Sequence, residues 1–260
     1  MASNGWLYGV CALGLGAGCR ESTPPDTDPT RRTTQQTEIA AVFPSSRGVS
    51  FATYLGGAGV DILRDVAEGP GGRIYVVGTN TSGLFPVSGG FDQSFSGEGD
   101  GVVAALTTGG ARLWSTYLGA DGVDEVTAIE VAPDGALIVA GRAGPGLPGV
   151  SSGFQTEFGG GNQDGFVCRL SSDGRLLYWC SYLGTGDDSG VSDVAVDPTG
   201  YVYLVAGIER GTLPPAWFRR GMWSERRGGK DAVLLKVAPN GSSVVWGTYL
   251  GGSGDEIGGL

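Results

Sequence analysis

Between residues 49 and 260, short apolar runs alternate with segments rich in Gly, Asp and Pro, and the order of the runs repeats three times. The sequence Tyr-Leu-Gly, always preceded by Thr or Ser, marks the period. It begins at Tyr54, Tyr117, Tyr182 and Tyr249, so the spacings are 63, 65 and 67 residues. A nearly constant period of this kind is typical of an array of one repeated supersecondary unit.

Each repeat contains four apolar runs with the length and residue types of β-strands. The second run is apolar at consecutive positions, which predicts a strand that is covered on both faces. The fourth run contains a Trp in every repeat and continues into the next Tyr-Leu-Gly. The runs are 63–67, 73–78, 100–106 and 113–115 in the first repeat, 126–132, 136–141, 164–170 and 177–180 in the second, and 191–196, 201–207, 231–237 and 244–247 in the third.

Four antiparallel strands in a meander form one blade of a β-propeller, and neighbouring blades cover the faces that one sheet leaves open. We therefore predict an all-β fold, a β-propeller built of four-stranded antiparallel blades. Its complete repeats are 53–115, 116–180 and 181–247, followed by a partial repeat at 248–260. Trp114, Trp179 and Trp246 are expected to pack between adjacent sheets, and a ligand-stacking platform is the alternative.

Three complete repeats are fewer than the roughly four to eight blades of most propellers. Three explanations are open. The chain is a truncated product of a longer gene, which is the explanation we favour, or two chains close a ring together, or the arc of blades stays open.

The repeated motifs resemble those of the SBBP bacterial β-propeller repeat over residues 49 to 257. They are Thr-Tyr-Leu-Gly-Gly-x-Gly-x-Asp, a following strand with Tyr-Val-x-Gly, Phe85-Pro86, and Asp-Gly-Phe-Val-x-x-Leu. The resemblance implies an exported or surface-associated bacterial propeller, and it implies no established catalytic residues. The third repeat departs from the pattern between its second and third strands.

Residues 1 to 19 contain an uncharged stretch of about a dozen apolar and small residues that ends before Cys19. This stretch has the length of the apolar region of a secretory signal and is too short to span a bilayer comfortably. The stretch resembles a bacterial lipoprotein signal, in which Gly16-Ala17-Gly18-Cys19 is the lipobox and Cys19 the acylated residue. An ordinary secretory signal or a misplaced start codon is the alternative, because no Lys or Arg precedes the apolar run. Residues 20–48 are rich in Pro, Thr and Ser and predict a flexible linker.

These features predict an exported protein of the bacterial outer membrane or cell surface, or alternatively a periplasmic or secreted one. A formal net charge of −10 argues against binding to nucleic acid or to anionic membranes. The chain has no histidine, which excludes Ser-His-Asp, Cys-His and His-metal chemistry. The 50 glycines follow no collagen-like period and fit many tight turns.

Acidic residues recur in the turns that follow Tyr-Leu-Gly. Ca²⁺ prefers several converging oxygen ligands, so these residues are candidate metal ligands. Asp also caps N–H groups in turns, and this structural role is the alternative that we favour there and at Asp100, Asp164 and Asp231. The candidate ligands are Asp61, Asp124, Asp187, Asp188, Asp255 and Glu256.

Cys168 and Cys180 lie on the predicted third and fourth strands of the second repeat. A hairpin centred on Gly174 places them directly opposite, close enough for a disulfide in an exported protein. Two buried thiols are the alternative, because the corresponding positions of the other repeats hold no cysteine.

Residues 209–230 combine cationic and aromatic side chains in an otherwise acidic protein. Such a loop is a candidate contact surface for an anionic partner, such as a polysaccharide or another protein, and a diverged, mobile insertion is the alternative. The candidate residues are Arg210, Trp217, Phe218, Arg219, Arg220, Trp223, Arg226 and Arg227.

The sequence therefore predicts a non-enzymatic binding or scaffold module of the cell envelope, with no cofactor other than a possible Ca²⁺. The expected partner is a protein or polysaccharide. Contact with a membrane is expected only through a lipid anchor, and self-association is expected only if the ring of blades is incomplete. The alternative is an exported enzyme that acts on glycans through two loop carboxylates about 5 to 10 Å apart.

Overall fold

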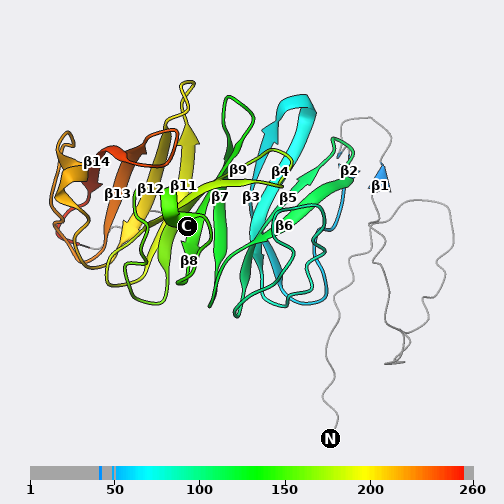
Figure 1. Cartoon of the computed structure of the whole chain (residues 1–260), viewed down its shortest axis with the longest axis horizontal. Coiled ribbons are helices and arrows are strands. Elements are labelled where there is room, and N and C mark those ends of the chain that lie inside the picture. Colours follow the sequence, from blue (N-terminus) through cyan, green and yellow to red (C-terminus); the bar gives the residue numbers. More distant parts are fainter. Residues whose placement is uncertain (1–40, 43–48, 50, 255–260) are drawn as a thin grey trace, which may run out of the picture. The chain divides into compact units, whose positions relative to one another are not determined.

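The computed structural model describes residues 41–42, 49 and 51–254, and this part of the chain is all-β (Figure 1). The first sheet contains β3 (Asp61–Gly69), β4 (Arg73–Asn80), β5 (Asp100–Leu106) and β6 (Arg112–Leu118). The second contains β7 (Glu125–Val131), β8 (Leu137–Ala143), β9 (Asp164–Leu170) and β10 (Leu177–Leu183). The third contains β11 (Ser189–Val196), β12 (Val202–Ile208), β13 (Asp231–Val237) and β14 (Val244–Leu250).

Within every sheet the strands are antiparallel and neighbour one another in chain order. The prediction of three four-stranded antiparallel repeats is therefore confirmed. The predicted third strands coincide with β5, β9 and β13, because Asp at the start and a turn after Leu or Val at the end delimit them clearly. The helical segments of this region are 3-10 turns of three or four residues.

The first strand of each sheet carries a β-bulge at the same place. One extra residue stands unpaired against the second strand, and a bulge of this kind increases the local twist. The bulges lie between Leu63 and Asp65, between Val126 and Ala128, and between Val191 and Asp193. The three sheets are thus copies of one module, including its backbone irregularity.

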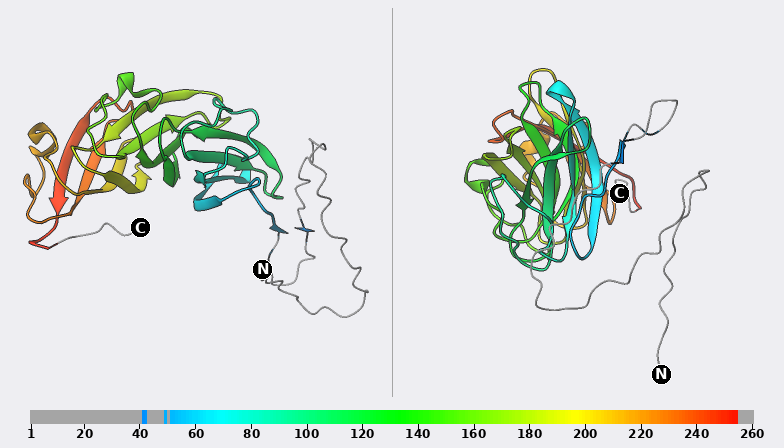
Figure 2. Two further views of the ribbon diagram at one scale, coloured as in Figure 1. Left: turned by 90° about the horizontal axis from the view of Figure 1, so that it is seen from below. Right: turned by 90° about the vertical axis from the view of Figure 1, so that its right-hand side faces the viewer.

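Consecutive sheets pack face to face, with the first strand of each sheet against the sheet before it (Figure 2). β7 contacts β3 and β4, and β11 contacts β7, β8 and β9. We call the face that a sheet turns toward the next sheet its trailing face, and the opposite one its leading face. Apolar side chains from one trailing and one leading face form a buried core at each of the two junctions. This is the mutual covering that the repeat pattern predicts.

An aromatic ring on the fourth strand packs against a turn glycine of the following sheet. Trp114 lies on Gly174, and Trp179 lies on Gly241, where an added Cβ would stand 2.4 and 2.3 Å from the ring. Both glycines have positive φ, +70° and +72°, a backbone conformation that residues with a side chain rarely adopt. The indole N–H of Trp114 donates to the carbonyl of Ser172 at 3.1 Å. The predicted packing of these two tryptophans between sheets is confirmed.

Each buried Tyr of Tyr-Leu-Gly ties the fourth strand to the long loop that joins strands two and three. The hydroxyl of Tyr117 donates to the carbonyl of Phe85 at 3.3 Å, and that of Tyr182 donates to the carbonyl of Gly144 at 2.9 Å. The hydroxyl of Tyr249 accepts the N–H of Leu213 at 3.3 Å. The motif is therefore an anchor for a loop as well as a marker of the repeat.

Two predictions about individual segments need correction. β1 (Ala41–Val42) pairs with β2 (Phe51–Ala52), so the stretch 20–48 is not wholly without regular structure. In β12, buried and half-buried residues alternate, whereas a strand covered on both faces was expected. The reason is that the trailing face of the third sheet has no neighbouring sheet within the described residues. The predicted signal peptide, with Cys19, lies outside the described residues.

No helix in the described part of the chain has the length and hydropathy needed to cross a lipid bilayer.

Candidate functional site

A pocket of about 170 Å³ lies at the junction of the second and third sheets. Its lining combines hydroxyl and amide groups, two cations, two carboxylates and two glycines. Both ends of the cationic loop predicted from the sequence reach it, because Glu209 and Lys230 are part of the lining. The lining residues are Thr127, Arg142, Gln163, Asp188, Ser189, Gly190, Val191, Ser192, Gly207, Glu209 and Lys230.

The pocket exists because two facing side chains are absent from the third sheet. Gly190 on β11 pairs with Gly207 on β12. The corresponding pair in the second sheet is Glu125 and Arg142, so both positions carry large side chains there. An added Cβ on Gly207 would stand 3.4 Å from Cε of Lys230. The two glycines thus leave bare backbone as the floor of the pocket, where a ligand can approach closely.

Charged side chains from both sheets surround this floor. The guanidinium of Arg142 binds the carboxylate of Glu125 with Nη2 and Oε2 2.9 Å apart. The Asp188 carboxylate accepts the backbone N–H of Asn162 at 2.6 Å. This hydrogen bond, helped by the nearby Arg142, lowers the pKa of Asp188 below its ordinary value. Asp188 is therefore ionised at neutral pH.

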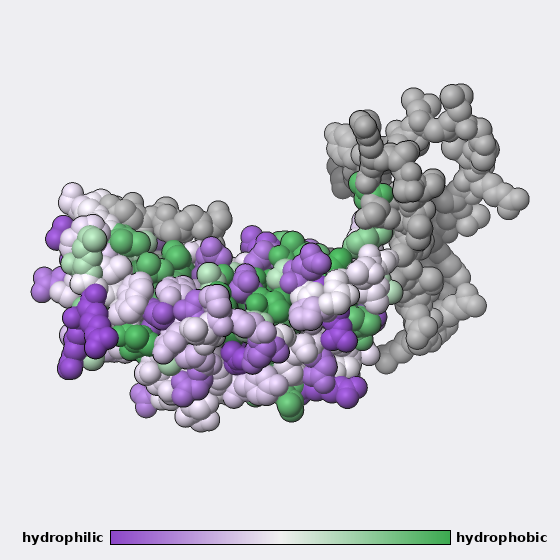
Figure 3. Space-filling view, turned by 90° about the horizontal axis from the view of Figure 1, so that it is seen from above, coloured by the Kyte–Doolittle hydropathy of each residue, from purple (hydrophilic) through white to green (hydrophobic). Residues whose placement is uncertain are grey.

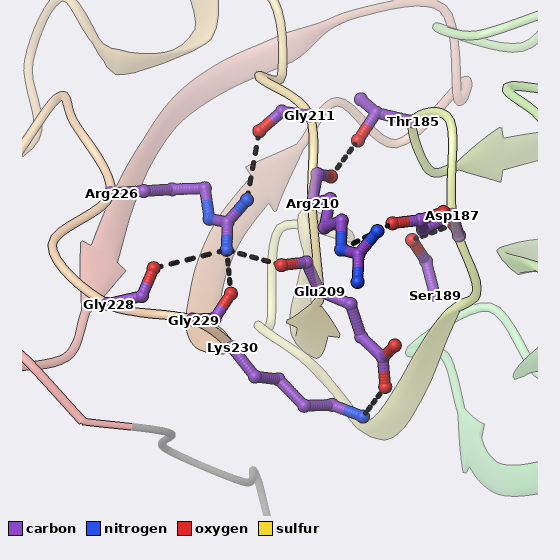
Figure 4. A network of polar contacts seen from close by, with 10 residues as sticks. All are labelled: Thr185, Asp187, Ser189, Glu209, Arg210, Gly211, Arg226, Gly228, Gly229 and Lys230. Carbon is purple, nitrogen blue, oxygen red and sulfur yellow. Dashed lines mark hydrogen bonds and ion pairs between the residues drawn. The ribbon is translucent and has the colours of Figure 1, made fainter.

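The loop of residues 209–230 forms a polar network beside the pocket (Figure 4). Nζ of Lys230 lies 2.5 Å from Oε1 of Glu209, and Nε of Arg210 lies 3.2 Å from Oδ2 of Asp187. The first pair belongs to the lining itself. An anionic ligand that reaches Lys230 has to compete with Glu209, so binding depends on how readily this partly exposed pair opens.

Arg226 organises this loop from within. Its guanidinium donates to the backbone carbonyls of Glu209, Gly211, Gly228 and Gly229. It also lies 3.4 Å from the fully buried carboxylate of Asp231. Arg226 was predicted as part of an exposed partner surface; the structure shows it half-buried, with its guanidinium bound to backbone carbonyls of its own loop.

The aromatic side chains of the loop divide between core and surface. Phe218 is buried and stacks on Tyr249 with ring centroids 4.5 Å apart, so it does not belong to a partner surface. Trp217 is half-buried and packs edge-on against Phe154 at 5.3 Å. Trp223 is half-buried beneath the guanidinium of Arg227, which lies 5.2 Å from the ring centroid. The exposed members of the predicted surface are the cations Arg210, Arg219, Arg220 and Arg227.

The carboxylate oxygens of two candidate metal ligands accept hydrogen bonds from nearby N–H groups. Asp61 accepts the backbone N–H of Gly57 at 2.8 Å and the side-chain amide of Asn80 at 2.7 Å. Asp124 accepts the backbone N–H groups of Ala120 at 2.7 Å and Gly144 at 2.8 Å. These contacts fit the structural alternative, in which Asp stabilises the turn.

The remaining candidate ligands are spread over different environments. Asp187 pairs with Arg210, and Asp188 caps the turn at Asn162. Asp255 and Glu256 lie outside the described residues. Within residues 51–254, no three acidic or cysteine side chains gather in a way that could hold a metal ion.

The aspartates that begin the third strands are fully buried and bind the loop before them. Asp100 accepts the N–H of Ser96 at 2.8 Å, Asp231 accepts that of Arg227 at 2.9 Å, and Asp164 accepts that of Gly159. Burial raises the pKa of Asp100 and of Asp164 to about 6. The structural role favoured for these aspartates agrees with this geometry.

Cys168 and Cys180 are directly opposite on β9 and β10 and form a disulfide, with their Cα atoms 4.0 Å apart. Both are fully buried in the core between the first and second sheets. The bridge is thus a buried part of the sheet, and neither cysteine belongs to the pocket lining.

The sequence predicted the loop beside the pocket but missed the pocket itself. The available signal was the alignment of the repeats, in which the third repeat has glycine at two facing positions that carry Ile62 and Thr79 in the first. A glycine pair in a strand is easily taken for a weak point of the sheet, and only the packing of the second and third sheets shows that both glycines line a pocket.

A comparison with models of known protein families gives no match to this chain, and a comparison with curated protein sequences gives none either.

Proposed function

We propose that this chain is an exported, envelope-associated binding module of the β-propeller type, and that the pocket between the second and third sheets is its ligand site. Three consecutive copies of one four-stranded sheet, packed face to face, support the propeller arrangement. The resemblance of the repeats to SBBP repeats, and of residues 1–19 to a lipoprotein signal, supports export. The observation that carries the binding role is the partly open polar pocket of about 170 Å³ whose lining includes Gly190 and Gly207.

The lining favours an acidic sugar as the ligand, within a polysaccharide. Arg142 and Lys230 offer cationic N–H donors for a carboxylate, and the hydroxyl oxygens of Ser189 and Ser192 offer acceptors for sugar hydroxyls. The lining carries as many carboxylates as cations, and the exposed arginines of the 209–230 loop add positive charge on the surface of that loop. In a protein with a net charge of −10, these exposed arginines favour the encounter of an anionic chain with the loop that contributes Glu209 and Lys230 to the pocket.

The alternative, glycan hydrolysis by paired carboxylates, requires a protonated carboxyl beside the ligand. The two carboxyls whose pKa rises to about 6 belong to Asp100 and Asp164, and neither lines the pocket. Asp188, which does line it, has a lowered pKa. The lining therefore supports binding over hydrolysis.

The test is calorimetric titration of the full chain with an oligosaccharide of uronic acids and with its neutral counterpart. Gly207→Thr introduces the side chain that the first sheet carries as Thr79 and fills the pocket floor. We expect the acidic oligosaccharide to bind, and Gly207→Thr and Lys230→Ala each to weaken binding by about tenfold or more. Arg73→Ala removes an exposed cation of the first sheet and should leave affinity unchanged.

Equal binding of the acidic and neutral oligosaccharides would contradict the proposed ligand class. Unchanged affinity in the correctly folded Gly207→Thr variant would contradict the proposed site. Release of reducing sugar on prolonged incubation would favour the enzyme alternative.

A further inference from the structure

The trailing face of the third sheet has the residues of an inter-sheet contact, but within residues 51–254 no sheet packs against it. Its fourth-strand leucine, Leu250, is 40% exposed, whereas the equivalent Leu118 and Leu183 are fully buried under the following sheets. Trp246 is half-buried, while Trp114 and Trp179 are buried against the glycines of the next sheet. The face thus carries the two residues that contact the following sheet at the other junctions.

The inner part of this face shows the same difference. Apolar side chains on β12 and β13 are half-buried at the positions where their counterparts in the first two sheets are buried. The half-buried residues are Tyr203, Val205 and Leu234, and their buried counterparts are Tyr75, Val77 and Val103 in the first sheet and Ile138, Ala140 and Val167 in the second.

The leading face of the first sheet is the complementary surface. On β3, Leu63 is 46% and Val66 is 61% exposed, although the equivalent residues of β7 and β11 are almost fully buried in the two junctions. Figure 3 shows that apolar residues lie at the surface of the described chain among predominantly polar ones. In the part of the chain that the structure describes, one leading face and one trailing face of this kind therefore have no sheet packed against them.

We call the turn glycine on which an aromatic ring packs at each junction the aromatic seat. On the leading face of the first sheet, this glycine is covered by an aromatic residue of the same chain. Phe51 stands three residues before Tyr54, as Trp114 stands three before Tyr117. Its ring lies on Gly110, where an added Cβ would stand 2.7 Å from the ring, and φ of this glycine is +83°. Phe51 is only half-buried, so it fills the seat without a sheet behind it.

We propose that two copies of this chain associate head to tail, with the trailing face of the third sheet of one copy on the leading face of the first sheet of the other. In this contact Trp246 of one copy replaces Phe51 of the other on Gly110. One aromatic ring replaces another on the same glycine, and the association additionally buries Leu250 of one copy and Val66 of the other. Apolar area removed from water is the driving force.

A second copy of this chain carries the surface that matches each open face. The contact between a trailing and a leading face occurs twice within the chain, at both junctions, and the two open faces carry apolar residues at the equivalent positions. Because the two faces differ, the contact is heterologous, and it generates either a closed ring or an open chain of copies.

Sedimentation equilibrium of the full chain over a wide range of concentration tests this proposal. We expect wild-type protein to associate reversibly, Trp246→Ala to weaken association by about tenfold or more, and Phe51→Ala to strengthen it by vacating the seat. Tyr178→Ala is the matched control, because Tyr178 is a 52% exposed aromatic on β10, next to Trp179 and outside the two faces proposed to meet. Its association should equal that of the wild type.

A mixing experiment distinguishes head-to-tail contact from other kinds of association. Val66→Asp places a charge on the leading face, at a position so exposed that folding tolerates it, and Leu250→Asp does the same on the trailing face. Each variant alone should fail to form extended assemblies, whereas their mixture should form a one-to-one pair through the two faces left intact. Absence of this pair, or wild type and Phe51→Ala that are both monomeric at every concentration, would overturn the proposal.

Discussion

Glycine residues determine how closely neighbouring sheets approach one another. Gly174 and Gly241 combine a positive φ with a tryptophan ring directly above the Cα atom, so a side chain is excluded for two independent reasons. The sequence predicted that the tryptophans lie between sheets. It did not predict their partners, because each glycine lies in the following repeat, and periodicity shows which residues recur but not which of them meet.

The buried aspartates are the residues whose protonation state depends most on the fold. Asp164 has a pKa of about 6 in the folded chain instead of its ordinary 3.8, because burial disfavours the charged form. The folded state therefore binds the proton more tightly than the unfolded state. The contribution of Asp164 to the free energy of unfolding therefore falls as the pH rises from about 4 to about 6, by about 3 kcal/mol at most.

We predict that Asp164→Asn removes this pH dependence. Relative to wild type, the variant should become more stable by roughly 1 to 3 kcal/mol between about pH 4 and about pH 7, because only the wild type has to ionise a buried carboxyl. Urea unfolding at the two pH values measures the difference. Glu68→Gln changes an exposed carboxylate on β3 and serves as control. A difference between Asp164→Asn and wild type that does not vary with pH would contradict the assignment.

At the scale of strands and sheets, the sequence predicted the elements but not everything that covers them. Apolar runs bounded by turn residues identified all four strands of each repeat. The bulges of the first strands did not show in the pattern, because an extra residue shifts alternation by one position and looks like ordinary variation. The interior of the 209–230 loop was also not predictable, since the burial of Phe218 and the carbonyl contacts of Arg226 depend on tertiary packing.

The disulfide of the second sheet permits a test in which its two cysteines are replaced by the residues that the first sheet carries at the same positions. The first sheet carries Ala104 and Ser115 at the positions of Cys168 and Cys180. We predict that Cys168→Ala with Cys180→Ser folds into the same sheet but loses about 2 to 3 kcal/mol of stability, because the unfolded chain is no longer cross-linked. Denaturant unfolding measures the loss, and circular dichroism checks the fold.

The matched comparison is wild-type protein under reducing conditions, which should lose a similar amount of stability. A double variant as stable as the oxidised wild type would show that the bridge does not stabilise the sheet. A variant that fails to fold would contradict the interpretation that the module is complete without the bridge.

At the scale of the whole molecule, three copies of one sheet contact only their immediate neighbours. Within the described residues, the contacts between sheets join the first to the second and the second to the third, and no contact of similar extent joins the first to the third. In such an array, the stability of each sheet depends on its own strands and on the junctions beside it. Both the pocket and the proposed association follow from this arrangement. The pocket lies at the junction of the second and third sheets, and the association would form the same kind of junction between two copies of the chain.

Hydrogen exchange of amides in the Gly241→Ala variant tests this arrangement most directly. The new methyl group would stand 2.3 Å from the ring of Trp179 and disturb the junction of the second and third sheets. Gly135→Ala is the control, because Gly135 also has a positive φ, +85°, but its nearest non-neighbouring atom is 3.9 Å away. We predict that Gly241→Ala lowers protection mainly in β11–β14 and leaves β3–β6 protected. An equal loss of protection in all three sheets would contradict the account, because it would show one indivisible core.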